Sequence, residues 1–181
     1  MGQIRATMAT LKEHVRSILE EIQLPRAARL ARRRDRTGPP EADAGPEAVV
    51  AANIEWLCRA QDRSTSSDGG VSHSFGLVSG WASSYPETTG YIVPTLLDYA
   101  KRVGDPSLTA RAVRMLDWLV SIQFPEGGFQ GGRVDSTPRV PVTFNTGQIL
   151  FGLAAGAAHD GRYHAPMARA ATWLRDTQDA D

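Results

Sequence analysis

Apolar residues recur at helical spacing along most of the chain, and no segment shows the sustained alternation that marks a half-buried β-strand. Short Gly-containing turns and long Gly-rich loops separate these apolar runs. The pattern predicts five helices in the main part of the chain, over residues 47–62, 87–102, 107–123, 144–158 and 163–178. Because short turns join antiparallel neighbours, we expect an all-α fold built of helical hairpins.

The N-terminal segment carries a separate apolar stripe at spacings of 4, 3, 4, 3 and 4 residues, formed by Ile4, Met8, Leu11, Val15, Ile18 and Ile22. This spacing predicts one extra amphipathic helix that docks on the main domain or pairs with a second copy. Residues 26–36 follow with six arginines, which form either a solvated tail or a surface for an anionic polymer or membrane. Residues 37–46 have the composition of a linker, so we expect hairpin repeats over residues 47–181.

The hairpin region contains an internal repeat. The pattern Trp-Leu-x-x-x-Gln occurs at Trp56, Trp118 and Trp173, and paired glycines follow the first two occurrences. A Thr-Gly pair opens a second kind of apolar run at Thr89 and again, 57 residues later, at Thr146. Self-similarity at such a period is typical of solenoids and closed toroids. We expect the three Trp side chains to be buried between outer helices.

The glutamines of the repeat are expected to bond free backbone groups at the helix ends, and they are Gln61, Gln123 and Gln178. Alternating outer and inner helices would place both long loops, residues 63–86 and 124–143, around one rim. Loops of more than about 12–15 residues usually carry function. The rim is therefore the first place to look for a site.

Two groups of known toroid proteins resemble this chain. The run from Gln123 to Phe129, Q-x-x-x-G-x-aromatic, resembles the Gln-Trp repeat of terpenoid cyclases and prenyltransferases, with Phe in place of Trp. The runs 85–91 and 99–105, which contain Tyr-Pro-Glu-Thr-Thr-Gly-Tyr and a Gly-Asp turn, resemble six-hairpin sugar enzymes. The resemblance implies an alpha/alpha toroid. Such toroids have about twelve helices, so this chain would supply a partial one, with open helical edges that could associate.

Candidate chemistry gathers around the first long loop. Glu87 stands where this loop enters a helix, and it is the best single candidate for a catalytic carboxylate, although capping of the helix start would also explain it. Aromatic faces with nearby amides suit sugar rings. The candidate ligand-binding residues are Trp81, Tyr85, Tyr91, Asn145 and Gln148. The acidic residues Asp68, Asp98 and Asp135 are the weaker candidates for a second carboxylate.

These residues favour a protein that binds or processes a sugar or uronate, and we expect no cofactor. The terpenoid-cyclase alternative would need an Asp-x-Asp-Asp cluster, which the sequence lacks. The prenyltransferase alternative would need zinc ligands. Cys58 is the single cysteine and the four histidines are scattered, so no metal site is expected. An interaction scaffold without catalysis is the third alternative.

The charge balance and the length of the apolar runs bear on which classes of protein are expected. Lys and Arg number 20, as do Asp and Glu, which gives no general reason to expect nucleic acid. This balance conceals an asymmetry, since residues 1–36 carry nine basic and four acidic side chains, or +5. No apolar run approaches the length of a transmembrane segment, and no signal peptide is seen. The cytoplasm is then the default expectation.

Overall fold

The computed structural model describes residues 18, 19, 21–38 and 42–178. The chain divides into two units, Met1–Ala44 with Gly76–Gly80, and Gly45–Phe75 with Trp81–Asp181. Most of the predicted N-terminal stripe lies outside the described residues. Its two described members, Ile18 and Ile22, are exposed.

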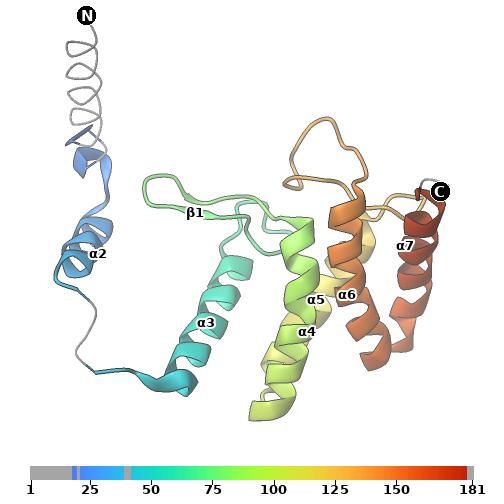
Figure 1. The fold of residues 1–181 in the computed structure, drawn as a ribbon, viewed down its shortest axis with the longest axis horizontal. Coiled ribbons are helices and arrows are strands. Elements are labelled where there is room, and N and C mark those ends of the chain that lie inside the picture. The colour runs from blue at the N-terminus through green and yellow to red at the C-terminus, as the bar shows by residue number, and fades with distance from the viewer. Residues whose placement is uncertain (1–17, 20, 39–41, 179–181) are drawn as a thin grey trace, which may run out of the picture. The chain divides into compact units, whose positions relative to one another are not determined.

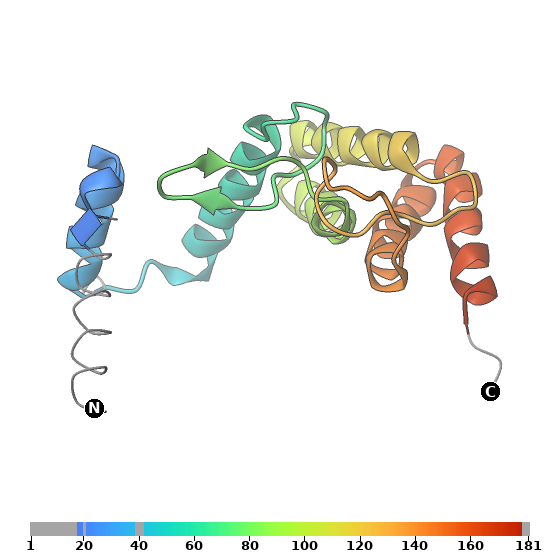
Figure 2. The same ribbon diagram turned by 90° about the horizontal axis from the view of Figure 1, so that it is seen from above.

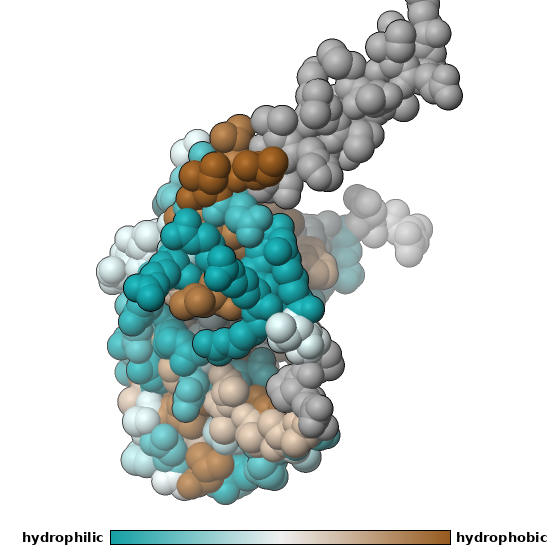
Figure 3. All heavy atoms as spheres, turned by 90° about the vertical axis from the view of Figure 1, so that its left-hand side faces the viewer, coloured by the Kyte–Doolittle hydropathy of each residue, from teal (hydrophilic) through white to brown (hydrophobic). Residues whose placement is uncertain are grey.

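The first unit contains the arginine-rich segment as helix α2 (Arg26–Arg36), in which no residue is buried. Arg32 and Arg36 each lie 3.9 Å from Glu21. The surface of α2 is mainly hydrophilic and is interrupted by apolar areas (Figure 3).

The second unit consists of helices joined alternately by long loops and tight turns (Figure 1). The helices are α3 (Gly45–Asp62), α4 (Pro86–Val103), α5 (Pro106–Ile122), α6 (Thr143–His159) and α7 (His164–Asp176), with a short 3-10 turn η1 (Gly161–Tyr163) before the last. The sequence-based helix limits lie within about two residues of these bounds, and the prediction of a mainly helical chain is confirmed.

Local chemistry explains where these helices start and stop. Helix α4 begins with Pro86, whose fixed φ and missing N–H suit a first turn, and it ends at Gly104, which has a left-handed φ of 69°. The next helix follows at once, because the carboxylate of Asp105 accepts a hydrogen bond from the Ser107 N–H at 2.8 Å. The tight turn predicted between α4 and α5 is therefore built from a C-terminal glycine and an N-cap aspartate.

The long loops contain more order than the sequence predicted. In the first loop, two short strands, β1 (Phe75–Gly76) and β2 (Gly80–Trp81), pair with each other. Antiparallel bridges also join Ser72 to Ser84 in the first loop and Gln130 to Pro141 in the second. Each loop thus folds back on itself shortly before the next helix begins.

Helices α4 and α6 lie side by side, as both ribbon views show (Figures 1 and 2), and their close approach depends on two glycines. A Cβ atom on Gly90 would lie 2.5 Å from the Cα of Ile149, and one on Gly152 would lie 2.3 Å from the carbonyl oxygen of Gly90. The buried core around this crossing includes Val93, Leu96, Leu116 and Leu153, each fully buried.

The repeated glutamines form the same contacts in two successive repeats. Nε2 of Gln61 donates to the carbonyl oxygens of Gly69 and Arg111 at 2.9 and 3.2 Å. Nε2 of Gln123 donates to those of Gly127 and Pro166 at 2.9 and 3.0 Å. Each glutamine therefore joins the end of its own helix to the loop that follows and to the second helix after it. Gln61 joins α3 to α5, and Gln123 joins α5 to α7.

The paired glycines complete this junction. A Cβ on Gly70 would lie 2.5 Å from the Trp118 ring, and one on Gly128 would lie 2.8 Å from the Trp173 ring. The preceding residues, Gly69 and Gly127, both have φ of +106°. Only glycine meets both demands without strain. The periodicity seen in the sequence is thus a repeat of three-dimensional contacts.

Three expectations about the repeat are wrong. Trp173 was expected to be buried, but it is only half-buried. Trp56 was expected to be buried, but it is 44% exposed, whereas Trp118 is only 5% exposed. Trp118 and Trp173 each pack on a glycine pair that precedes them in the chain, and the described residues before Trp56 contain no such pair. The side chain of Gln178 was expected to bond a helix end, but it is exposed, and the hydrogen bond at this position comes from its backbone N–H to the carbonyl of Arg175.

Replacing Gly90 with alanine should destabilise the protein by about 1–3 kcal/mol, because the added methyl group meets the backbone of α6. The matched control is Gly147→Ala, since a Cβ at that equivalent position meets nothing within 4 Å. It should be neutral or stabilising by up to about 1 kcal/mol. Urea unfolding at low protein concentration measures both. Equal effects would contradict the described crossing of α4 and α6.

Replacing Trp118 with alanine should lower the free energy of unfolding by about 3–5 kcal/mol, because the ring is buried over Gly70. The control is Trp56→Ala, which removes the exposed member of the same motif and should cost clearly less. Thermal and urea unfolding monitored by circular dichroism give both values. A near-neutral Trp118→Ala variant would exclude this ring from the core.

Candidate functional site

Four of the candidate site residues come together where the two long loops lead into α4 and α6, and they are the predicted catalytic Glu87 and the predicted binding residues Tyr85, Tyr91 and Asn145. Glu87 is the second residue of α4 and Asn145 is the third of α6. Burial raises the pKa of Tyr85 above its ordinary value, and the neighbouring Glu87 carboxylate raises it further, with a small contribution in the same direction from Tyr91. The Asn145 amide lowers it. All three side chains are therefore close to the Tyr85 hydroxyl.

The Asn145 amide stands out within this cluster. Its side chain is only 6% exposed, and among the described residues its Nδ2 has no hydrogen-bond partner. The amide acts on the Tyr85 phenol as a hydrogen-bond donor that favours its ionised form, although no full hydrogen bond to the hydroxyl is formed. A buried donor left unsatisfied costs about 1–3 kcal/mol. The Nδ2 atom is itself buried, so an acceptor oxygen from outside the chain would reach it only if the surrounding side chains moved aside.

The loop adds a residue that sequence reasoning missed. The ring of His73 meets that of Tyr85 edge-on, with centroids 4.8 Å apart and planes at 85°. Backbone hydrogen bonds from His73 to Ser83 and from Tyr85 to Val71, both 2.9 Å, bring these rings together. No sequence signal marks this contact. It depends on the antiparallel bridge between Ser72 and Ser84, and the irregular loop sequence does not reveal that pairing.

The structure places Trp81 in a different group. Its ring packs against those of Trp56 and Phe75, each at a centroid distance of 4.9 Å. Trp81 is therefore part of a separate aromatic cluster at the end of α3. Gln148 follows Asn145 by three residues on α6, so it lies on the same side of that helix. It is half-buried, whereas Tyr91 is 41% exposed.

The weaker acidic candidates are engaged in loop structure. Asp68 accepts hydrogen bonds from the Ser84 hydroxyl at 2.6 Å and from the Gly70 N–H at 3.1 Å. Asp135 accepts one from the Ser83 hydroxyl at 2.8 Å and pairs with Arg133 at 3.4 Å. Both carboxylates thus hold the rim loops in place.

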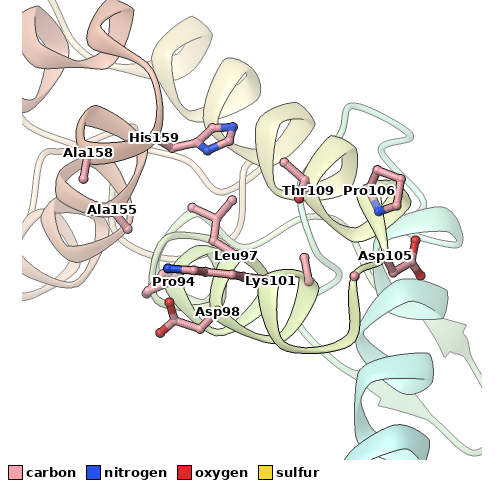
Figure 4. A pocket seen from close by; sticks show the side chains of 12 residues that line it. Pro94, Leu97, Asp98, Lys101, Asp105, Pro106, Thr109, Ala155, Ala158 and His159 are labelled. Atoms are coloured by element: carbon pink, nitrogen blue, oxygen red, sulfur yellow. The ribbon is translucent and has the colours of Figure 1, made fainter.

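Asp98 lies at the other end of α4. A helix rises by about 1.5 Å per residue, which puts Asp98 roughly 16 Å from Glu87 along the axis. Asp98 lines a cavity of about 610 Å³ near the tight turns, together with Lys101 and His159 (Figure 4). That cavity is therefore distinct from the cluster around Tyr85.

Neither a metal-binding cluster nor a reactive thiol is found in the described part of the chain. Within the described ranges, no group of three or more His, Cys, Asp or Glu side chains could hold a metal ion. Burial raises the pKa of the Cys58 thiol, so the thiol stays protonated and unreactive at neutral pH. Among the described helices none is long and apolar enough to cross a membrane.

The comparisons with known proteins give no family. No protein-family model, no curated protein and no solved structure matches the chain. The class that can be stated is therefore a mainly α-helical protein with a repeated helix–loop–helix unit and a polar cluster at the loop end of α4 and α6.

The cluster makes a directional prediction about the titration of Tyr85. Glu87→Gln should lower the pKa of Tyr85, because the carboxylate disfavours the phenolate. Asn145→Leu should raise it, because a donor that stabilises the phenolate is lost. NMR titration of ¹³C-labelled tyrosine measures both shifts.

Tyr163 is the internal control for this titration. Burial, together with a hydrogen bond to Asp117, raises its pKa to about 12. It lies in the short turn before α7, so its titration should not move in either variant. Unchanged titration of Tyr85 in both variants would mean that the three side chains do not form one cluster.

Proposed function

We propose that this protein binds a carbohydrate at the polar cluster formed by Tyr85, Glu87 and Asn145. The single observation that carries the proposal is the buried Asn145 amide, whose Nδ2 lacks a partner among the described residues beside a tyrosine and a carboxylate. Sugar hydroxyls both donate and accept hydrogen bonds. They would accept from Asn145 and donate to Glu87.

The aromatic residues support the same class of ligand. Tyr91 is partly exposed next to the cluster, and His73 and Tyr85 present ring faces and edges. The C–H faces of a sugar ring pack on aromatic rings while its hydroxyls bond neighbouring polar groups. Gln148, one turn further along α6, would add a second amide to the contact surface. In this proposal α4 and α6 are the inner helices of a partial alpha/alpha toroid.

Binding is favoured over glycoside hydrolysis. Hydrolysis of the usual kind needs two carboxyl groups about 5–9.5 Å apart across the bond. Glu87 is the carboxylate whose charge acts on Tyr85, whereas Asp68 and Asp135 are held by loop hydrogen bonds. Glu87 therefore serves as an acceptor for hydroxyl groups in this proposal, and its role as a catalytic acid is not needed.

The terpenoid and prenyl alternative is less compatible with this cluster. An isoprenoid chain offers no acceptor to Asn145 and would take water away from Glu87. Burial of unpaired polar groups costs several kcal/mol. The pairing of buried donor and carboxylate thus supports a hydroxyl-rich ligand over a hydrocarbon one.

A glycan array that includes neutral and uronic-acid oligosaccharides tests the proposal, followed by calorimetric titration with the best ligand. Asn145→Leu and Glu87→Gln should each weaken binding by about tenfold or more, since each removes a hydrogen bond worth roughly 1.5–3 kcal/mol in a charged or buried setting. Neither should shift the melting temperature by more than a few degrees.

Asp98→Asn is the matched control, because this carboxylate is on the same helix but lines the cavity at the opposite end. It should leave sugar affinity unchanged. The proposal fails if no glycan binds, or if the Asp98 variant weakens binding as much as the Glu87 variant does. Capping alone would explain Glu87 if its variant only lowered stability by about 0.3–1 kcal/mol.

A further inference from the structure

Helix α2 presents a strongly charged surface. Its 11 residues include six arginines, and none of its residues is buried. Four of these arginines have spacings of 3, 4 and 3 and so share one side of the helix, and they are Arg26, Arg29, Arg33 and Arg36. Glu21 lies 3.9 Å from Arg32 and from Arg36. None of the other four arginines pairs with an acidic side chain of the described residues. The helix therefore carries a row of guanidinium groups that are mostly unpaired.

This row of charges lowers the stability of the helix that carries it. Arginines three or four residues apart, such as Arg29 with Arg33, repel each other, although those in the last turn suit the helix dipole. The first turn contains no acidic residue, and no side chain caps the start of the helix. An anionic surface would remove the repulsion. A segment whose charges oppose its own fold is typical of a binding surface.

Exposed apolar side chains accompany the arginines. Leu30 is 47% exposed, and its neighbours three or four residues away on the helix surface are Arg26, Arg33 and Arg34. The segment before α2 adds three large apolar residues at 54%, 55% and 66% exposure, and they are Ile18, Leu19 and Ile22. The contacts of Glu21 with α2 place this segment beside the helix. On the face drawn in Figure 3, apolar surface adjoins the hydrophilic surface of α2.

We infer that α2 and the segment before it bind the surface of an anionic lipid bilayer. The guanidinium groups bond to lipid phosphates and carboxylates, and the exposed leucines and isoleucines enter the boundary between headgroups and acyl chains. Arginine suits this depth, because its aliphatic stem packs on apolar groups while its charged end stays among the headgroups. Charge attraction and apolar insertion together supply the two contributions that stable attachment to a membrane surface requires. The proposed carbohydrate site plays no part in this binding.

A nucleic acid is the competing anionic partner. Its phosphates would attract the same arginines, but they offer no contact to the exposed leucines and isoleucines. Apart from its arginines, α2 has no amide, hydroxyl or aromatic side chain that could bond to a base or stack on one. The exposed apolar residues therefore favour a lipid surface.

Co-sedimentation of the full chain with lipid vesicles tests the inference. Phosphatidylcholine vesicles with about 30% phosphatidylserine should bind the chain at least about tenfold more tightly than pure phosphatidylcholine vesicles do. Raising the salt concentration from about 0.1 M to about 1 M should weaken binding to the anionic vesicles, because the Debye length falls from about 10 Å to about 3 Å. Equal binding to both kinds of vesicle, or binding to neither, overturns the inference.

Replacing Arg26, Arg29 and Arg33 together with glutamine should weaken binding to the anionic vesicles by about 100-fold, since each charge near the surface contributes roughly fivefold. All three residues are exposed, so the variant should fold, which circular dichroism checks. Lysine at the same positions keeps the charge and should retain the affinity within about threefold.

A matched control removes the same amount of charge from the second unit. It replaces three exposed arginines with glutamine, and they are Arg63, Arg133 and Arg175. The control should bind anionic vesicles within about threefold of the wild-type chain. If it loses as much affinity as the α2 variant, the net charge of the chain carries the binding and the inference fails.

Leu30→Gln separates a lipid surface from a nucleic acid. It should weaken binding to the anionic vesicles by about fivefold or more, because an apolar side chain no longer leaves water. A DNA duplex of about 20 base pairs and a single-stranded RNA of about 20 nucleotides are the competitors, each supplying as many anionic groups as the lipid. Most of the wild-type chain should stay on the vesicles. Displacement by either competitor, or unchanged vesicle binding by Leu30→Gln, overturns the inference.

Discussion

The rest of the second unit depends on one constraint, which is the close contact of each glycine pair with a tryptophan-bearing helix. The first pair contacts α5 and the second contacts α7. Gly70 touches the Trp118 ring and Gly128 touches the Trp173 ring, at distances that leave no room for a side chain. The glutamine before each pair then bonds to both the loop and that helix. Burial of a tryptophan and satisfaction of backbone carbonyls therefore occur at one place. This junction sets where each long loop starts.

The same junction fixes the start of the following helix. The N–H of Val71, directly after the first pair, donates to the Thr89 hydroxyl at 2.9 Å. In the second repeat the N–H of Phe129 donates to the Thr146 hydroxyl at the same distance. A buried hydroxyl network adds to this order in the first loop, since Ser84 bonds to Ser64 and to Asp68. Tyr85, the next residue, is thereby held in position.

The helices and their repeat could be predicted from sequence because their signals are local or periodic. Apolar spacing, Pro106 and Gly104 mark the helix limits, and the recurring glutamines mark the junctions. The cluster of Tyr85, Glu87 and Asn145 could be predicted in part, since two neighbouring helices that start at the same end bring their first turns together. That prediction needed only the order of the helices.

The remaining features depend on the path of the loops, for which the sequence carries no periodic signal. Trp81 was grouped with Tyr85 because it lies four residues away, but the strand pairing turns it toward Trp56 and Phe75. The same pairing brings His73 to Tyr85 from twelve residues away. Trp56 was expected to resemble Trp118, yet burial of this residue depends on a glycine pair from a preceding repeat.

Comparison of the two repeats separates scaffold from site within this one chain. Where the residue performs the junction chemistry, the repeats are identical, as at Gln61 and Gln123, Gly70 and Gly128, and Thr89 and Thr146. Where the residue faces the cluster, they differ, as at Tyr85 and Val142, Glu87 and Phe144, and Tyr91 and Gln148. A structural requirement recurs with every repeat, whereas a binding site needs each group once. The polar and aromatic differences between the repeats therefore support the carbohydrate site proposed above, because packing alone does not require them.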